Sequence, residues 1–371
     1  MNFDLTEEQE VVRDLARQIF EGQAPPERVK EVESADGFDR ELWAQLAASG
    51  IQALCVPEEH GGSGMGMVEA ALVLTELGRR VAPVPLAPSM VAALVLARHG
   101  TPEQQQRYLP RIAAGEVVAI ALAEPGANDL THPSLRATPP GSGVHLAGVK
   151  PAVPHAQNAA ILLVSASLPD GAPLVAVVDT ADAAAGLRVT PLSTTNHEPQ
   201  AELDLDLTVA SEQVLGEPGG AGADVLRALA EHSLVAIAAL QVGVAEGSLK
   251  MTAEHLSTRI QFGRPLSAFQ ATGQRAADGY ITTEAMRVTA LNAAWRLSSG
   301  LDAARDVAVA AYWATEGAQQ VVLAGQHLHG GIGSDVDYPV HRYFLWGTQL
   351  ATALGGASSH LARLGRLIAT A

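Results

Sequence analysis

The sequence predicts an α+β protein in which an N-terminal α-helical domain (residues 1–116), a middle antiparallel β domain (117–218) and a C-terminal α-helical bundle (219–371) follow one another. Two observations predict this order. Helix caps and apolar residues at helical spacing fill both ends of the chain. Between them lie short apolar runs bounded by Pro, Gly and Asp. No helix of crossover length separates these runs, which favours antiparallel pairing.

The N-terminal domain carries clear helix punctuation. Thr6 and Gln9 form a capping box, which satisfies free amides where a helix begins. Apolar residues from Val11 to Phe20 then share one face, and Pro25-Pro26 ends this helix. Similar signals predict three further helices, at about 39–50, 67–80 and from 101 onward.

The rest of the chain divides into strands and long helices. Strands are expected at 117–123, 144–149, 160–165, 174–179 and 203–207. Helices are expected near 222–257, 266–300, 303–327 and 340–369. Helices of this length imply a bundle with faces left over to pack against other subunits.

Composition excludes several classes of function. Lys and Arg number 24 against 40 Asp and Glu, and the net charge of −16 argues against binding to nucleic acid. The single Cys55 excludes a disulfide framework. The aliphatic stretch Leu234–Val244 is too short for a membrane span and contains Gln241. Because residues 1–10 are acidic without an apolar core, we expect no secretory signal and a cytoplasmic location.

Two motifs in the C-terminal domain suit a nucleotide. Arg259-Ile260-Gln261-Phe262-Gly263 is followed by Phe269-Gln270, and an Arg supplies both charge and a fork of donors for a pyrophosphate. Phe262 can lie against the nucleotide, and Gln270 offers an amide. The structural alternative is that Arg259 interacts with the end of a helix dipole and that Phe262 belongs to the core.

The second motif runs from His327 to Gly333 and includes Gly330 and Gly331, which let backbone amides approach a ligand closely. His327 and His329 could suggest a metal site. Residues two apart do not share a helical face, and no carboxylate or Cys completes the set, so we expect no metal.

These motifs and the domain order resemble the acyl-CoA dehydrogenases over essentially the whole chain. The resemblance implies an FAD-dependent α,β-dehydrogenation of an acyl-CoA thioester, with an electron-transfer flavoprotein as acceptor. It also implies that one group of residues contacts the FAD bound mainly by a neighbouring subunit: Arg259, Phe262, Gln270, His327, Gly330 and Gly331. His327 stands where the family usually has Gln.

The resemblance also reveals what is missing. The family reaction needs a carboxylate base, which stands either before a Gly-Thr pair in the last domain or near the start of its first helix. The matching positions here are Leu354 and Ser233, and neither side chain is a base at neutral pH. Glu231 and His232 are close in sequence, but a step of one or two residues turns a helical side chain by ~100–200°.

The flavin-ring side departs from the family as well. The segment Glu124–Asp129 is one residue shorter than the family's E-P-x-A-G-S-D, and Ala123 replaces a hydroxyl donor. Ala152 stands where a Trp packs on the flavin in relatives, and Pro154 removes a hydroxyl and an amide donor. Groups that reach a neighbour's cofactor are thus retained, while those that serve the chain's own flavin are lost.

This split favours a non-catalytic subunit that shares FAD with a base-carrying acyl-CoA dehydrogenase paralogue, in an α2β2 tetramer. The resemblance is strongest to the base-lacking subunit of the heteromeric enzymes of steroid side-chain (cholesterol) degradation. Two alternatives stay open. One is an active homotetramer in which Glu231 or His232 is a displaced base, and the other is a scaffold that binds neither FAD nor acyl-CoA.

Overall fold

A computed structural model describes residues 4–124, 129–139, 141, 143–183, 185–216 and 221–369. Its contacts divide the chain into two compact units. One unit combines Met1–Lys30, Ala71–Ala82 and Leu234–Ala371, and the other combines Glu31–Ala70 and Pro83–Ser233. Three helices run from one unit into the other: α2 (Pro26–Ser34), α4 (Met67–Arg80) and α7 (Gly222–Thr258).

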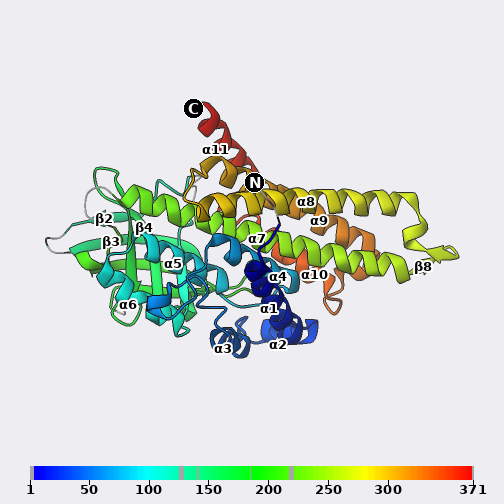
Figure 1. Ribbon diagram of the computed structural model, residues 1–371, viewed down its shortest axis with the longest axis horizontal. Helices are drawn as coiled ribbons and strands as arrows, with labels where there is room; N and C mark the ends of the chain where they lie inside the picture. The colour runs from blue at the N-terminus through cyan, green and yellow to red at the C-terminus, as the bar shows by residue number, and fades with distance from the viewer. Residues whose placement is uncertain are drawn as a thin grey trace. The chain divides into compact units, whose positions relative to one another are not determined.

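The first unit is helical. Besides parts of α4 and α7, it contains α1 (Glu7–Gln23), α8 (Gln270–Ser298), α9 (Ala304–His329), α10 (Val340–Leu350) and α11 (Ala357–Ala369). The capping box at Thr6 and Gln9 forms as expected. Figure 1 shows α8 and α9 running side by side along α7. By length and composition α7 could cross a membrane, but 89% of its apolar window is buried inside the protein, as in a core helix.

Glycines let α4 and α7 pack backbone against backbone within this unit. A Cβ atom on Gly243 would lie 2.0 Å from the carbonyl oxygen of Thr75, and one on Gly78 would lie 2.2 Å from that of Leu240. Beside this contact Glu76, which is 2% exposed, accepts hydrogen bonds from the guanidinium groups of Arg17 and Arg79. Close packing and a buried carboxylate with two cations therefore hold α1, α4 and α7 together.

The second unit packs α3 (Arg40–Ala48), α5 (Leu86–His99) and α6 (Pro102–Ala113) with a seven-stranded sheet. The strands are β1 (Val118–Ala121), β2 (Arg136–Thr138), β3 (Gly143–Pro154), β4 (Ile161–Ser167), β5 (Pro173–Asp179), β6 (Leu187–Leu192) and β7 (Gln200–Ala210). Their order is β1-β4-β2-β3-β7-β6, and β5 pairs with β4. Both faces of β4 and β5 are buried, so the core of this unit lies around these two strands.

The predicted fold class is confirmed, with several corrections. The pairing is not wholly antiparallel, since β1 and the end of β2 pair with β4 in parallel. The long connection that a parallel pair needs is supplied by β2 and β3 rather than by a helix. The helix expected over 340–369 is two helices, because Gly355 adopts φ +102° between α10 and α11. The elements that were not expected from the sequence include α2, α5, β2 and β6.

Candidate functional site

The segment that follows α7 forms an exposed hairpin. Strands β8 (Ile260–Gln261) and β9 (Arg264–Pro265) pair around a turn in which Phe262 and Gly263 have φ +53° and +80°. Two left-handed residues are what a tight hairpin turn with the right strand twist requires. At the base of the hairpin, the amide of Leu266 donates to the carbonyl of Arg259 over 2.9 Å. Figure 1 shows this hairpin beyond the ends of α7 and α8.

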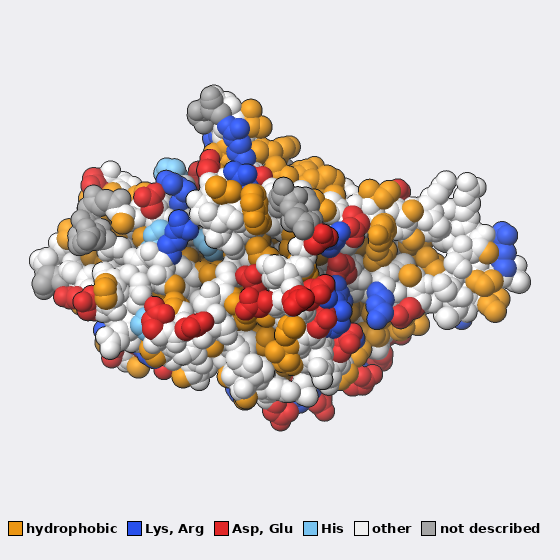
Figure 2. Space-filling view, viewed as in Figure 1, with side chains coloured by type: hydrophobic (Ala, Val, Ile, Leu, Met, Phe, Trp, Pro, Cys, Tyr) orange, Lys and Arg blue, Asp and Glu red, His pale blue; other side chains and the backbone are white. Residues whose placement is uncertain are grey.

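Cationic and aromatic side chains cover the hairpin. The side chain of Phe262 is 91% exposed, so the alternative that it belongs to the core is wrong. Its ring meets Phe269 edge to face at 6.1 Å, and the guanidinium of Arg264 lies 4.1 Å from the Phe269 ring centroid. Figure 2 shows basic and apolar side chains together at this projecting end. Arg264 was not among the expected residues, although a second Arg directly after the R-x-x-F-G motif was a usable signal.

The second motif lies at the end of α9. His327 is exposed, and the glycines begin the short helix η5 (Gly330–Ser334). Gly330 has φ +66° and ψ −143°, a conformation open essentially to Gly alone. A Cβ atom on Gly331 would meet no atom within 4 Å, whereas one on Gly333 would lie 2.4 Å from the carbonyl oxygen of Gln326. Gly333 is therefore needed for packing, while the space beside Gly331 is open to a ligand.

The two motifs lie near each other. The rings of His255, four residues before Arg259, and His329, directly before Gly330, stack with centroids 4.5 Å apart. Gln270 is exposed as the first residue of α8. The expected cofactor-contacting residues thus occupy one end of the helical bundle.

Leu354 and Ser233 are the two residues that the resemblance aligns with the family's base. Leu354 lies in the turn between α10 and α11. Ser233 lies in α7 and is 8% exposed, and its hydroxyl has no hydrogen-bond partner among the described residues. Glu231 is 7% exposed. The Nδ1–H of His232 donates to the carbonyl of Ala228 over 2.7 Å, and burial lowers the pKa of His232 to about 4.

Glu124, the first residue of the shortened segment Glu124–Asp129, is held by a buried network. Its oxygens accept hydrogen bonds from the ammonium of Lys150, the hydroxyl of Ser134 and the amide of Leu135, and Lys150 also donates to Ser165 over 2.9 Å. Burial alone would raise the pKa of Glu124, but the bonds from Lys150 and Ser134 outweigh it and lower the pKa. This carboxylate is a structural ion and not a base at neutral pH.

The other two residues that the resemblance assigns to the flavin-ring side lie in β3. Ala152 lies in β3 at a shift of register between Lys150 and Val153, and Pro154 ends the strand opposite Gln200. Residues 125–128 of the shortened motif lie outside the described residues.

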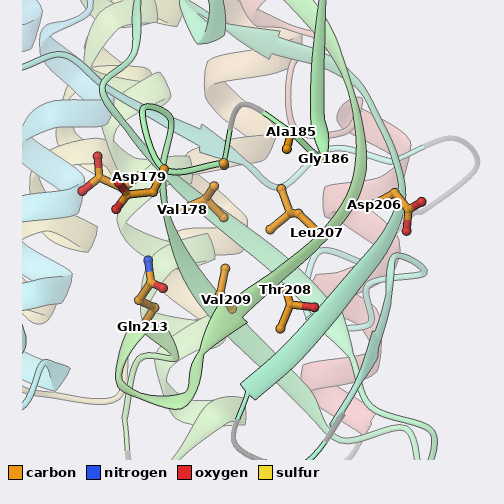
Figure 3. A pocket seen from close by; sticks show the side chains of 11 residues that line it. Val178, Asp179, Ala185, Gly186, Asp206, Leu207, Thr208, Val209 and Gln213 are labelled. Atoms are coloured by element: carbon orange, nitrogen blue, oxygen red, sulfur yellow. The ribbon is translucent and has the colours of Figure 1, made fainter.

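A pocket of about 310 Å³ in the second unit is separate from these motifs. It lies between Val178 and Gln213, and Figure 3 shows Asp179 and Asp206 on opposite sides of it. Asp179 accepts hydrogen bonds from Arg111, which hold its pKa below the usual value. Among the described residues no group of three or more His, Cys, Asp and Glu could hold a metal ion.

Fold and motifs together define the class of the protein. Residues 6–116 match the N-terminal domain of acyl-CoA dehydrogenases, and residues 220–366 match their C-terminal domain. The chain belongs to the acyl-CoA dehydrogenase family, whose members bind FAD.

Individual members of the family are similar to the chain over nearly its whole length. The chain is 38% identical to acyl-CoA dehydrogenase FadE27 of Mycobacterium tuberculosis, over 100% of this chain and 99% of the relative. Two solved complexes are similar over nearly the whole chain. A variant of the Tcur3481–Tcur3483 steroid ACAD shares 45% identity over 98% of both chains, with a TM-score of 0.92. The ChsE4–ChsE5 complex from M. tuberculosis shares 38% identity over 100% of both chains, with a TM-score of 0.93.

Proposed function

We propose that this chain is the non-catalytic subunit of a heteromeric acyl-CoA dehydrogenase. It completes the FAD site of a base-carrying paralogue in an α2β2 tetramer, and the substrate is a steroid side-chain CoA thioester. One observation carries the proposal. By the resemblance, Leu354 and Ser233 replace the base that removes the substrate proton, while the residues that would reach a neighbour's cofactor lie exposed.

The exposed end of the bundle fits the nucleotide part of FAD. Arg259 would pair with the pyrophosphate, because guanidinium donors match phosphate geometry. Phe262 would pack on an apolar surface of the cofactor. The backbone at Gly330 and Gly331 would approach it closely, since none of the described residues fills the space beside Gly331. When bound, FAD supplies the acceptor for hydride. This chain's own part is to bind and orient the nucleotide.

The ring side of the chain does not provide a second complete site. Glu124 is committed to Lys150 and Ser134, and Ala152 offers no ring to stack on the flavin. The proposed pair of subunits therefore binds one flavin. The acyl-binding site that the second subunit would otherwise form is then free to accommodate a bulky acyl group. The Tcur3481–Tcur3483 steroid ACAD and the ChsE4–ChsE5 complex support this assignment, since both are assemblies of two named components.

Reconstitution tests the proposal. The chain is produced alone and together with a base-carrying paralogue, and flavin content and dehydrogenation of a steroid-CoA thioester are measured. We expect activity and bound FAD only in the mixed assembly. We further expect an electron-transfer flavoprotein to accept its electrons, and a cytoplasmic location for the assembly in the cell. A yellow and active assembly of this chain alone would contradict the proposal.

The main alternative to this proposal is an active homotetramer in which Glu231 or His232 serves as a displaced base. His232 has a neutral ring in α7, but a pKa of about 4 makes it a weak acceptor for a proton that leaves carbon. Two variants of the mixed assembly, Glu231→Gln and His232→Asn, separate the ideas. We expect both to retain turnover within about threefold, whereas loss of a general base costs ~10²–10⁴-fold.

A scaffold without any role in cofactor binding is the other competitor. Arg259→Ala in the mixed assembly should weaken FAD binding by ~10-fold or more, since a hydrogen bond to a charged group is worth ~1.5–3 kcal/mol. The matched control is Arg188→Ala, which removes an exposed Arg that pairs with Asp204 in β7. An unchanged FAD affinity for Arg259→Ala would favour the scaffold.

A further inference from the structure

Helices α7 and α9 approach each other closely just before the two nucleotide-reaching motifs begin. A Cβ atom on Gly325 of α9 would lie 2.6 Å from the hydroxyl oxygen of Ser248 and 3.0 Å from that of Thr252, both on α7. One turn further along each helix, His255 and His329 stack with ring centroids 4.5 Å apart and an angle of 27° between the rings. The small residues therefore bring the helices near enough for two imidazoles to lie face to face.

His329 is fixed at the centre of this contact. It is 5% exposed, and its Nδ1 lies 2.7 Å from the carbonyl oxygen of Gly325. Because a carbonyl oxygen only accepts, Nδ1 carries the proton and the ring is held in one orientation. The ring of Tyr338 covers it at 5.4 Å.

The second ring nitrogen of His329 makes no contact that would define its role. Its Nε2 is buried and has no hydrogen-bond partner among the described residues. The flat face of the ring, which stacks on His255, is therefore the part of this side chain that joins the two helices.

Both rings stand at the start of a nucleotide-reaching segment. The carbonyl of His255 accepts from the amide of Arg259 over 2.8 Å, so the last turn of α7 links this ring directly to the hairpin. His329 directly precedes Gly330 and Gly331. A shift between the rings would change the distance between the cation and the glycine backbone.

We propose that the stacked His255 and His329 are positioning residues that hold Arg259 and the Gly330–Gly331 backbone at the separation needed to grip the nucleotide of FAD. The inference rests on the proposed function, because it assigns a purpose to the geometry of that same site. Neither ring touches the cofactor in this scheme. Each acts through the segment that follows it.

The test compares flavin release from the mixed assembly, followed by the rise in flavin fluorescence after dilution. We expect His329→Ala and His255→Ala to release FAD ~3- to 10-fold faster, the range that loss of one aromatic pair gives. Their hydrogen exchange should also rise in both segments, 259–270 and 330–334. The double variant His255→Phe/His329→Phe keeps two flat rings and should release FAD at nearly the wild-type rate. Gln320→Ala, an exposed change on the same helix, is the control.

The outcomes separate the inference from the function that it rests on. If His329→Ala releases FAD at the wild-type rate while Arg259→Ala releases it faster, the positioning role is wrong and the proposed function stands. If Arg259→Ala is also without effect, the proposed function itself fails. If the Phe pair releases FAD as fast as the Ala variants, stacking is not what holds the segments, and the inference is overturned. The Phe pair also keeps the test open if either Ala variant does not fold.

Discussion

At the scale of single residues, Lys150 of β3 forms a buried ion pair with Glu124, three residues after the end of β1. The two side chains are 0% and 1% exposed. Lys150→Met removes the cation and leaves Glu124 buried beside three neutral donors, the amide and hydroxyl of Ser134 and the amide of Leu135. We expect the free energy of unfolding to fall by ~3–5 kcal/mol, which urea denaturation would measure.

The exposed pair of Arg188 and Asp204 is the matched control in the same sheet, with side chains 72% and 39% exposed. Arg188→Met should change the free energy of unfolding by ~0–1 kcal/mol. Equal losses for the two variants would show that burial does not set the strength of the Lys150 pair.

His155 predicts a dependence of stability on pH. It is 3% exposed, packs edge to face on Phe38 at 5.7 Å, and burial lowers its pKa to about 3. Below pH ~6.5 the unfolded chain takes up a proton that the folded chain refuses, so this group reduces the free energy of unfolding by ~1.4 kcal/mol per pH unit down to the folded pKa. Above pH ~6.5 it has no such effect.

His155→Asn should flatten the fall in stability between pH 6.5 and 4, while His232 retains its own contribution. Asn suits the left-handed φ of +56° at this position. The measurement is urea unfolding at several pH values. His132→Asn, which changes a side chain that is 80% exposed, should leave the slope as it is. A slope equally steep in His155→Asn would assign the pH dependence to other groups.

At the scale of elements, glycine determines how closely helices pack. Gly243→Ala would force a Cβ atom to within 2.0 Å of the Thr75 carbonyl oxygen and 2.7 Å of the Arg79 amide, so α4 and α7 must separate. We expect a loss of ~1–3 kcal/mol in the free energy of unfolding. Gly273→Ala in α8 meets nothing within 4 Å and should instead stabilise the chain by ~0.5–1 kcal/mol. Thermal unfolding of both variants measures these changes. A lower midpoint for Gly243→Ala and a higher one for Gly273→Ala are expected.

The elements that sequence reasoning identified are those with a local signal. The capping boxes at Thr6 and Thr101 are formed, because a cap is made by residues only three apart. Helix α5 was missed since it is buried on nearly all sides and lacks an amphipathic period. The parallel pairing of β1 with β4 was also missed, because it joins residues 43 positions apart and leaves no local mark.

In the candidate site, too, local motifs could be predicted from the sequence and contacts between distant residues could not. The motifs that contain Arg259 and Gly331 are contiguous in the chain and could be named from sequence. The stacking of His255 on His329 could not, since it depends on how closely two long helices pack at Gly325. Glu124 was noted as part of a motif, but its commitment to Lys150 is a contact made only in the folded sheet.

At the scale of the whole molecule, α8 presents an apolar stripe. Ile281, Val288 and Trp295 recur every seven residues and are 65%, 40% and 37% exposed. Such a stripe is typical of helices that pack against another subunit. Val288→Asp should weaken association by more than ~10-fold, because an unpaired carboxylate in an apolar contact is costly. Light scattering after gel filtration would measure the mass of the assembly.

Ser299→Asp, an exposed change beyond the end of α8, is the control for charge alone. The folded chain should keep its helical content in both variants. An assembly of undiminished mass in Val288→Asp would place the subunit contact elsewhere on the molecule.

The exposed hairpin also makes the unassembled chain vulnerable. Arg259 offers a trypsin cleavage point on a short exposed segment, at its bond to Ile260, whereas the bond after Arg264 is protected by Pro265. Seating against another polypeptide would shield the Arg259–Ile260 bond, so limited digestion becomes a direct gauge of pairing.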